Sequence, residues 1–572
     1  MSAQQTIAVE TVAEAYLRLL AARGIDFLFA NGGTDFAPIV EAAASIEAKG
    51  GSRLRIVAVG HENVAASMAH GYYLRTGRPQ AVMFHVNVGT ANGIIALANA
   101  ARDQVPMLFT AGRNPLTEFG RPGSRDTGIH WGQEMFDQAG MVRELCKWDY
   151  ELRDGGQLEA VIDRALEIAT TEPCGPVYLA LPREVLSAPM TSFSYADPPR
   201  RGFGTVAGPT QDAVERAAAL LAKAERPLIF ARATGRVAEN AAALAAFAEQ
   251  FALPVIEYRA LANSIATDHP MHYGFDPLPH LRDADVILAI DSDVLWIPTR
   301  HGNPPDDCKV IHLGVDPLFA RIPIRSFPCD AVVTGAPRYA LPQLGAALAE
   351  RIEPAAIAAR RARIAAERAR VDGDSADAVA RVARQMPIHP IWATHCIAEA
   401  KGDDAIVINE YPLLSRHAPF RRPRTYYGTP AGGGLGWGIG AAIGAKLDEP
   451  DRLVIAALGD GAYMFGNPTA GHQVLRALGL PVLFVIFNNA RWEEVERAAL
   501  AVFPDGHARR ANRMPVAELG PAANYEHMMA VYDGYGERVE TPEALPGALE
   551  RALHAVRVEK RQALLNIIVG HR

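Results

Sequence analysis

Short apolar runs alternate along this chain with longer, alanine-rich stretches in which apolar residues recur at helical spacing. The runs favour Val, Ile and Phe and stop at a glycine, a proline or a polar residue, as LRIVAVG (54–60) and RLVIAALGD (452–460) do. Strands that alternate with helices form parallel sheets covered by those helices. The pattern therefore predicts an α/β protein built on parallel sheets.

The alternation falls into three segments of similar size. The apolar runs of the first lie at 27–33, 54–60, 81–86, 105–112 and 175–182, those of the second at 226–232, 253–258, 284–291 and 308–316, and those of the third at 405–410, 452–460, 480–489 and 563–570. Residues 192–210 are rich in Pro, Gly and Ser, which is typical of a linker. Residues 349–380 have the composition of a solvated connecting helix. We expect an N-terminal domain over 1–190, a central Rossmann-like domain over 203–345, a helical linker over 346–384 and a C-terminal domain over 385–572.

Composition excludes several classes of protein. A chain of 572 residues is too long for one core, and 49% hydrophobic with 21% charged residues is ordinary for a folded protein. The formal net charge of -7 argues against a nucleic-acid surface. The polar N-terminus is no secretory signal, and no apolar run reaches the ~20 residues of a membrane span. Five scattered cysteines without metal-ligand spacing suit a reducing compartment. We expect a soluble, cytoplasmic protein with no nucleic-acid or membrane partner.

Polar residues follow two strands of the third segment. Asp460 and Gly461 come after the run that stops at Gly459, and Asn489 ends the next run. Ligands of open parallel sheets bind at the carboxyl ends of strands, so one intervening helix would bring Asp460 and Asn489 together. Their oxygens suit Mg²⁺ or Ca²⁺, and the helix after Gly461 offers N–H groups to phosphate. Each piece alone is more often turn or cap chemistry. Together they predict a metal-diphosphate site.

This joint pattern resembles the thiamine diphosphate motif of the decarboxylase and acetolactate synthase superfamily. Further stretches resemble blocks of that family in the expected order: IVAVGHENVAASMAHGYYLRTGRP (56–79), HVNVGTANGIIALANAARDQVPMLFTAG (85–112), GPVYLALPREV (175–185) and TPAGGGLGWGIGAAIGAKL (429–447). The resemblance covers essentially the whole chain. It implies three doubly wound parallel-sheet domains: a pyrimidine-binding domain, a central domain and a diphosphate-binding domain.

The resemblance also implies roles for single residues. Glu62 would protonate the pyrimidine ring, although a helix N-cap is its plainer interpretation. Gly433 would accept the 4′-amino group on its carbonyl, and Leu435 would support the bent cofactor. Mg²⁺ would be held by Asp460, Asn489 and the backbone carbonyl of Arg491. Further residues expected beside the cofactor are Asn92, Gly461 and Ala462.

The same resemblance implies an assembly. Glu62 and the metal site come from facing domains of two subunits, so a homodimer is the minimum unit and a homotetramer the expected one, with active sites at subunit interfaces. ADP or CoA is a further candidate ligand of the central domain.

Two regions bear on the reaction. His85 falls where benzoylformate-decarboxylase-like enzymes have an active-site histidine, and a structural histidine is the alternative. Glu493 and Glu494 are expected on the first turn of the helix after the metal site, where acids usually complement the helix dipole. Pyruvate decarboxylases have a catalytic glutamate where this chain has Val495, which weakens the interpretation of this chain as a pyruvate decarboxylase.

The whole-chain pattern looks most like bacterial 2-hydroxyacyl-CoA lyases of the 2-hydroxyisobutyryl-CoA type. Such an enzyme cleaves a 2-hydroxyacyl-CoA to formyl-CoA and a ketone or aldehyde, with Glu493, or else Glu494, as the base for the 2-hydroxyl. Residues 501–534 are predicted to form a lid. Weak candidates for the CoA phosphates are Arg321, Arg325, Arg421, Arg422, Arg424, Arg509 and Arg510.

Two other hypotheses stay open. A 2-oxo-acid decarboxylase or carboligase, of the benzoylformate decarboxylase or acetolactate synthase kind, would need no CoA and fits His85. A non-catalytic homologue that keeps the fold is disfavoured by the intact Glu62, Leu435, Asp460 and Asn489.

Overall fold

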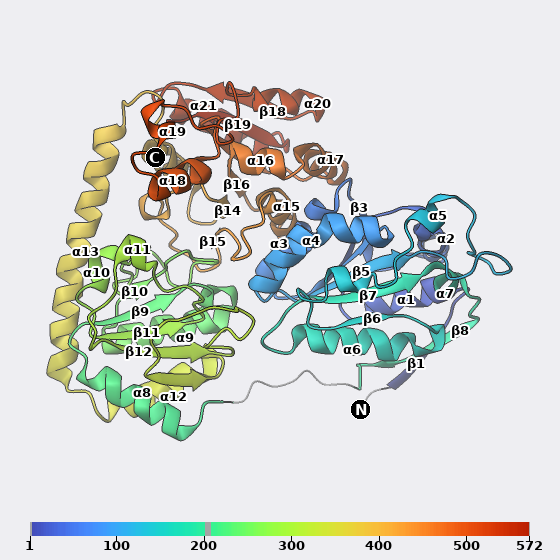
Figure 1. The fold of residues 1–572 in the computed structure, drawn as a ribbon, viewed down its shortest axis with the longest axis horizontal. Coiled ribbons are helices and arrows are strands. Elements are labelled where there is room, and N and C mark those ends of the chain that lie inside the picture. The colour runs from blue at the N-terminus through green and yellow to red at the C-terminus, as the bar shows by residue number, and fades with distance from the viewer. Residues whose placement is uncertain (1–2, 201–207, 571–572) are drawn as a thin grey trace. The chain divides into compact units, whose positions relative to one another are not determined.

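The computed structural model describes residues 3–200 and 208–570, which form three open parallel sheets with helices packed on them (Figure 1). Contacts divide the chain into two compact units. Unit 1 takes residues 1–205, 430–450 and 465–478, and unit 2 takes residues 206–429, 451–464 and 479–572. The prediction of three doubly wound parallel sheets is confirmed.

The sheet of unit 1 has six parallel strands in the order β3-β2-β4-β5-β7-β6. The strands are β2 (Phe27–Asn31), β3 (Arg55–Ala58), β4 (Gln80–Phe84), β5 (Met107–Arg113), β6 (Asp149–Glu151) and β7 (Val177–Pro182). The helices are α1 (Val12–Ala22), α2 (Ala37–Ala48), α3 (Glu62–Thr76), α4 (Val86–Arg102), α5 (Ile129–Gly132), α6 (Leu158–Thr170), α7 (Arg183–Ser187), α15 (Trp437–Asp448) and α17 (Pro468–Leu478). Strands β4 and β7 are buried along their whole length, as expected when helices cover both faces.

Helices α3 and α15 of unit 1 cross at van der Waals distance because glycines line the contact. A Cβ atom on Gly444 would lie 2.1 Å from the Met68 carbonyl oxygen, and one on Gly440 would lie 2.5 Å from that of Val64. On the opposite helix, a Cβ on Gly71 would lie 2.2 Å from the Ala441 carbonyl oxygen. Any side chain at these positions would force the helices apart.

The central sheet lies in unit 2 and has five parallel strands in the order β10-β9-β11-β12-β13. They are β9 (Pro227–Ala231), β10 (Val255–Ile256), β11 (Val286–Ile290), β12 (Lys309–Gly314) and β13 (Ala331–Thr334). The helices are α8 (Gln211–Lys223), α9 (Ala238–Phe251), α10 (Leu278–Leu281), α11 (Pro298–His301), α12 (Pro337–Ala349) and α13 (Pro354–Val382).

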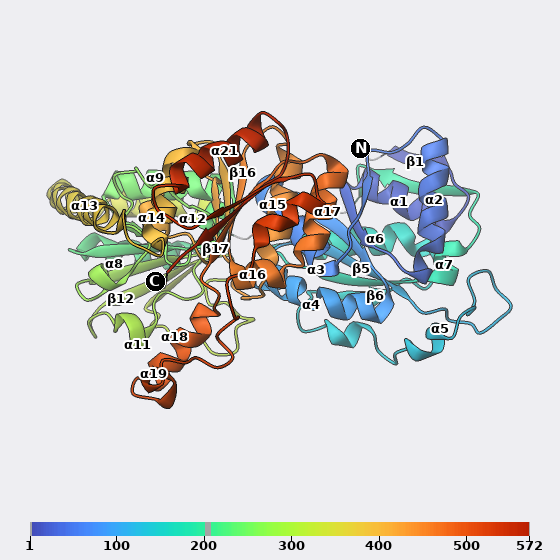
Figure 2. The same cartoon turned by 90° about the horizontal axis from the view of Figure 1, so that it is seen from above.

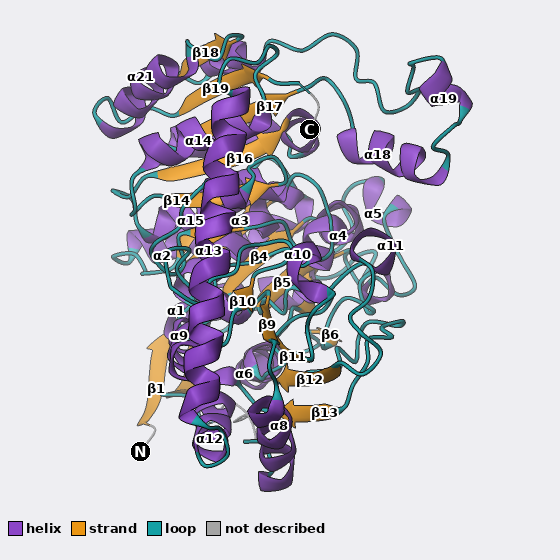
Figure 3. Ribbon diagram, turned by 90° about the vertical axis from the view of Figure 1, so that its left-hand side faces the viewer, coloured by secondary structure: helices purple, strands orange, loops and turns teal. Residues whose placement is uncertain are grey.

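Helix α13 is the 29-residue connector, and it runs as one long helix along unit 2 (Figure 3). Most of it is solvated, as the sequence predicts, but two arginines fasten it. The buried Arg360 donates to the carbonyls of Leu221, Ala224 and Phe251 at the ends of α8 and α9. Arg368 donates to three further carbonyls, those of Thr267, His269 and His272. The connector is therefore attached to the central sheet.

The second sheet of unit 2 has six parallel strands in the order β15-β14-β16-β17-β19-β18. They are β14 (Ile406–Glu410), β15 (Tyr426–Tyr427), β16 (Val454–Gly459), β17 (Leu483–Asn488), β18 (Tyr535–Val539) and β19 (Ala563–Ile568). The helices are α14 (Pro390–Lys401), α16 (Asp460–Phe465), α18 (Glu493–Val502), α19 (His507–Arg510), α20 (Met528–Val531) and α21 (Leu545–Arg557). Figures 2 and 3 both show α18 and α19 projecting away from this sheet.

Two differences from the sequence prediction concern the linker and the helix after Asp460. The expected linker over 192–210 begins with a strand, β8 (Ser192–Asp197), which pairs antiparallel with β1 (Ala3–Ala8), and residues 201–207 lie outside the described part. The single helix expected between Asp460 and Asn489 is two helices, α16 and α17, separated at Asn467 with a φ of 52°. Among the described residues, no helix has both the length and the apolar character needed to cross a membrane.

Candidate active site

Asp460 stands at the carboxyl end of β16 and opens α16. Its carboxylate is 2% exposed and accepts two backbone hydrogen bonds, from the N–H of Gly461 at 2.8 Å and from that of Ala490 at 2.7 Å. Burial raises the pKa of Asp460 to about 6, although these N–H groups act in the opposite direction. A buried carboxylate without a cation is costly, so this side chain is suited to binding one.

The loop after β17 brings Asn489 to the same edge of the sheet. Ala490 has a φ of 55°, and the hydrogen bond from its backbone N–H to the Asp460 carboxylate links the ends of β16 and β17. Asn489 accepts the N–H of Arg491 at 3.1 Å and donates to Glu493 at 3.3 Å. A pocket of about 640 Å³ opens beside Asn489, Ala490 and Arg491. The predicted juxtaposition of the two strand ends is therefore present.

Gly461 and Ala462, expected beside the cofactor, form the buried first turn of α16. A Cβ atom on Gly461 would lie 2.2 Å from the ring of Trp492, so only glycine fits below this indole. Helix α16 is only six residues long.

These donors suit Mg²⁺. The described residues contain no group of three or more His, Cys, Asp or Glu side chains that could hold a metal. A cation at this edge would therefore depend on the Asp460 carboxylate, the Asn489 amide and the Arg491 carbonyl, completed by oxygens of a bound diphosphate and water. Mg²⁺ is commonly held in this way, by few protein ligands and the phosphates of a substrate or cofactor.

Glu62 begins α3 in unit 1 and is 7% exposed. The N-cap of α3 is His61, whose ring accepts the N–H of Asn63 at 3.2 Å, so Glu62 is not the capping residue. Asn92 of α4 donates to the Glu62 carboxylate at 2.9 Å. The structure therefore brings Glu62 and Asn92 into contact, two residues that the sequence analysis assigned to the cofactor.

Gly433 and Leu435 lie in a turn fixed to the same two helices of unit 1. Asn99 of α4 both donates to the Gly434 carbonyl and accepts its N–H, each at 2.9 Å. Asn63 of α3 donates to the Leu435 carbonyl at 3.4 Å. Gly433 has a φ of 65°, which glycine adopts without strain. The turn is held by polar bonds at its backbone.

His85 is the N-cap residue of α4 and is bonded to Asp35, a residue that the sequence analysis missed. The distance from His85 Nδ1 to Asp35 Oδ1 is 2.6 Å, and Asp35 also accepts the N–H of Val86. The hydrogen bond between His85 and Asp35 is the largest cause of the raised pKa of His85. A Cβ on Gly112 would lie 1.6 Å from the Asp35 carboxylate, so glycine is required there. His85 is thus half-buried in a fixed orientation rather than bonded to backbone.

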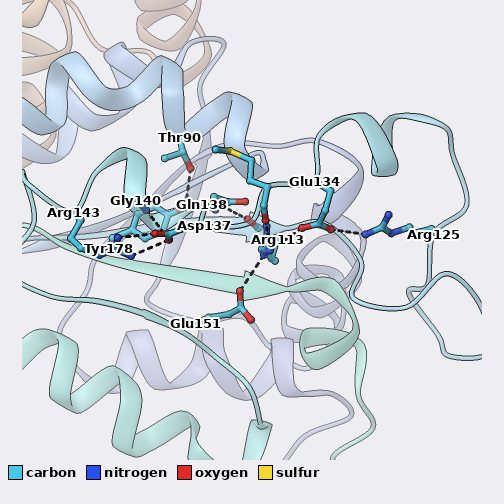
Figure 4. A network of polar contacts seen from close by, with 12 residues as sticks. Thr90, Arg113, Arg125, Glu134, Asp137, Gln138, Gly140, Arg143, Glu151 and Tyr178 are labelled. Atoms are coloured by element: carbon cyan, nitrogen blue, oxygen red, sulfur yellow. Dashed lines mark hydrogen bonds and ion pairs between the residues drawn. The ribbon is translucent and has the colours of Figure 1, made fainter.

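The other ring nitrogen of His85 faces Gln133, at 3.3 Å from its amide nitrogen. Gln133 lies on the loop between β5 and β6, which a network of polar contacts anchors (Figure 4). Arg113 pairs with Glu134 and Glu151, and Arg125 also pairs with Glu134. This network holds the loop that places Gln133 against His85.

A second part of the same network supports the start of α4. Gln138 donates to the Tyr178 hydroxyl at 2.7 Å, and Tyr178 bonds Thr90 at 3.0 Å (Figure 4). Thr90 in turn donates to the Val86 carbonyl at 2.7 Å. Val86 has a φ of 30°, rare for a β-branched residue, and these bonds keep it in that conformation.

Glu493 and Glu494 lie on the first turn of α18, as expected, but in different surroundings. The Glu493 side chain is 21% exposed and accepts the hydrogen bond from Asn489. Glu494 is 57% exposed and pairs with Arg497 at 3.0 Å. Of the two acids, Glu493 is therefore the one connected to the candidate metal ligand.

The arginines considered for CoA phosphates serve different local contacts. Arg325 donates to the carbonyls of Ser292 and Asp293, and Arg421 pairs with Asp403. Arg422 pairs with Asp404. Arg509 and Arg510 donate to nearby backbone carbonyls of Pro504 and Asp505. These contacts give the arginines local structural roles.

Known protein families and relatives match most of this chain. Models of the N-terminal, central and C-terminal domains of thiamine pyrophosphate enzymes match residues 10–141, 214–344 and 410–567. The chain is 28% identical to a probable 2-ketoarginine decarboxylase of Pseudomonas aeruginosa, over 86% of this chain and 83% of that protein. It is 27% identical to an acetolactate synthase large subunit of Mycobacterium tuberculosis, over 94% and 92%.

A solved structure shares the fold. The thiamine diphosphate-dependent 4-hydroxybenzoylformate decarboxylase of Rhodococcus jostii RHA1 superposes with a TM-score of 0.76 and 22% identity, covering 98% of this chain and 99% of that one.

Proposed function

The chain belongs to the thiamine pyrophosphate enzymes, and on that premise we propose that it is a thiamine diphosphate-dependent decarboxylase or carboligase acting on a 2-oxo acid. The relatives named above are decarboxylases and an acetolactate synthase, and none of them is a 2-hydroxyacyl-CoA lyase. These relatives favour the 2-oxo-acid decarboxylase or carboligase, the alternative hypothesis from the sequence, over the 2-hydroxyacyl-CoA lyase.

We assign the cofactor to the residues predicted for it. Asp460, Asn489 and the Arg491 carbonyl would hold Mg²⁺ and, through it, the diphosphate, while Glu62 would bond the pyrimidine ring. When bound, thiamine diphosphate supplies a carbanion that attacks a carbonyl carbon and stores electrons while a carbon–carbon bond breaks. Asn92 would hold the Glu62 carboxylate in the position from which it protonates the pyrimidine ring.

The observation that carries the proposal is the 2.6 Å contact between Asp35 and His85. Asp35 is 3% exposed and fixes a proton on His85 Nδ1, so Nε2 is the nitrogen that exchanges protons with a substrate. Decarboxylation of a 2-oxo acid requires a proton for the carbon that loses carbon dioxide. A histidine whose pKa is raised can hold that proton near neutral pH.

One observation keeps the acyl-CoA lyase as a second candidate. The hydrogen bond from Asn489 orients Glu493 beside the candidate metal ligands, where a base for a substrate hydroxyl would act. The arginines named for CoA, by contrast, are engaged in local contacts. The lyase therefore depends on Glu493 alone, and the decarboxylase on the Asp35–His85 pair.

A product assay separates the two functions. The protein, loaded with thiamine diphosphate and Mg²⁺, receives a panel of 2-oxo acids that includes pyruvate and benzoylformate, and separately 2-hydroxyisobutyryl-CoA. We expect carbon dioxide from at least one 2-oxo acid, and a loss on the order of 10²–10⁴ in kcat for His85→Ala, the usual contribution of general acid–base catalysis. Glu493→Gln should retain measurable decarboxylation. Formyl-CoA and acetone from the thioester, abolished in Glu493→Gln, with no carbon dioxide from the panel, would establish the lyase instead.

The assembly remains as the sequence predicts it. We propose a homodimer or homotetramer with active sites completed between subunits. Light scattering of the purified protein measures the number of subunits directly.

A further inference from the structure

Tyr411 comes directly after β14, at the same edge of the sheet as the candidate metal ligands. Strands β14, β16 and β17 are neighbours, with Glu410 in register with Leu458 and Gly459 with Phe487. Tyr411, Asp460 and Asn489 are thus the first residues after three adjacent strands. Because neighbouring strands lie ~4.8 Å apart, the Tyr411 backbone borders the turn that begins at Asp460.

The conformation of Tyr411 is unusual for a bulky residue. Its φ is 81°, and the side chain is 38% exposed. A bulky residue at positive φ is a genuine outlier, and such strain is concentrated at functional sites. Glycine would adopt this conformation without cost, so the position holds a tyrosine at the expense of backbone strain.

Arg259 approaches this edge from the central domain, within the same unit. It precedes Ala260–Asn263, a segment that pairs with β15 through bonds from Gly428 N–H to the Leu261 carbonyl and from Asn263 N–H to the Tyr426 carbonyl. Strand β15 is the neighbour of β14. Arg259 itself has a φ of 52° and is exposed.

Arg259 differs in its interactions from the other charged residues near Tyr411. Burial is the largest cause that raises the pKa of Tyr411, the Glu410 and Glu494 carboxylates add to it, and the Arg259 guanidinium acts against it. Arg259 therefore lies within electrostatic range of the phenol. Glu494 already pairs with Arg497, whereas Arg259 has no ion-pair partner in residues 3–200 and 208–570.

We propose that Tyr411 and Arg259 form the subsite that receives the far end of the substrate, and that the preferred substrates are 2-oxo acids with a second carboxylate. A phenol O–H and a guanidinium can both donate, the latter through two parallel N–H groups, and a carboxylate is the acceptor that this pair fits. The proposal rests on the proposed function, because it places the tail of a 2-oxo acid whose reacting end lies at the cofactor.

The test compares two substrates of equal chain length and similar size that differ in charge at the far end. One is 2-oxoglutarate, and the other is 5-methyl-2-oxohexanoate, in which an isopropyl group replaces the second carboxylate. The wild-type protein should prefer the first by kcat/KM. Arg259→Gln should lower kcat/KM for 2-oxoglutarate on the order of 10- to 100-fold, the value of a charge-assisted bond, and leave the isostere within about 2-fold. Tyr411→Phe should lose roughly 3- to 10-fold on 2-oxoglutarate alone.

Arg282→Gln is the matched control, because Arg282 is an exposed arginine that follows α10 in the same unit. It should change neither substrate. Calorimetric binding of glutarate gives a readout without turnover, and it should weaken in Arg259→Gln but not in Arg282→Gln. Equal effects of Arg259→Gln on both substrates, with glutarate binding unchanged, would overturn the subsite and leave the decarboxylase standing. If no 2-oxo acid is turned over, the proposed function fails, and glutarate binding alone decides the subsite.

Discussion

At the scale of single residues, the Asp35–His85 contact is the feature with the clearest chemical consequence. His85 keeps a raised pKa because the Asp35 carboxylate accepts from its Nδ1, although burial acts against this. The charged Asp35–His85 pair therefore contributes to the free energy of unfolding. This contribution is fully present below pH 6.5, the usual pKa of histidine, and is lost as the pH rises through the raised pKa of folded His85.

Replacing Asp35 by Asn should therefore lower the pKa of His85, because the amide carries no charge to stabilise the imidazolium. NMR titration of ring-labelled histidine measures this pKa directly. The variant should also be destabilised more at pH 6 than at pH 9. His389 provides an internal reference, since burial alone lowers its pKa and neither Asp35 nor His85 is among the causes. An unchanged pKa of His85 in Asp35→Asn would remove Asp35 from the account.

The hydrophobic pattern places Asp460 and Asn489 at the ends of apolar runs and so identifies them from the residues alone. Glu62 and His85 were assigned through the resemblance to the family. Asp35 and Gln133 escaped notice for a physical reason. Asp35 lies beyond the glycines that follow β2, and Gln133 lies within a long loop, so only the folded chain brings them to His85. The one available signal was a lone acid after FLFANGG.

At the scale of elements, the glycines between α3 and α15 allow a close contact between two helices of unit 1. Gly444→Ala should lower the free energy of unfolding by about 1–3 kcal/mol, because its methyl group would meet the Met68 carbonyl oxygen at 2.1 Å. Gly373→Ala is the matched control, since Gly373 lies within α13 and has no atom within 4 Å of the added Cβ. It should be neutral or stabilising by up to about 1 kcal/mol. Calorimetric melting measures both, and equal effects would contradict the packing argument.

Most buried strands were predicted from the sequence, whereas the ribbon strands and several edge strands were not. Strands such as β4, β16 and β17 are continuous apolar runs, because helices cover both of their faces. By contrast β6 (DYE) and β18 (YGERV) lie at sheet edges and have too few apolar residues to form a run. The break between α16 and α17 was also missed, because the conformation of Asn467 has no apolar signature.

At the scale of the whole molecule, the units interleave segments that are distant in sequence. Residues 430–450 and 465–478 belong with the N-terminal part of the chain in unit 1, while the residues between them belong to unit 2. A reading of periodicity assigns domains as consecutive stretches, and it cannot detect this exchange, which depends on the fit of α15 against α3. The boundaries at 190, 203, 345 and 385 therefore stay a prediction.

On the proposed function, each chain binds one thiamine diphosphate through a cation at Asp460. Calorimetric titration of the cofactor into the apoprotein tests this most directly, in the presence and absence of Mg²⁺. We predict one site per chain that depends on Mg²⁺, no measurable binding in Asp460→Ala, and retained binding without catalysis in Glu62→Gln. Equal binding by Asp460→Ala and the wild-type protein would contradict the assignment of this strand edge as the metal-diphosphate site.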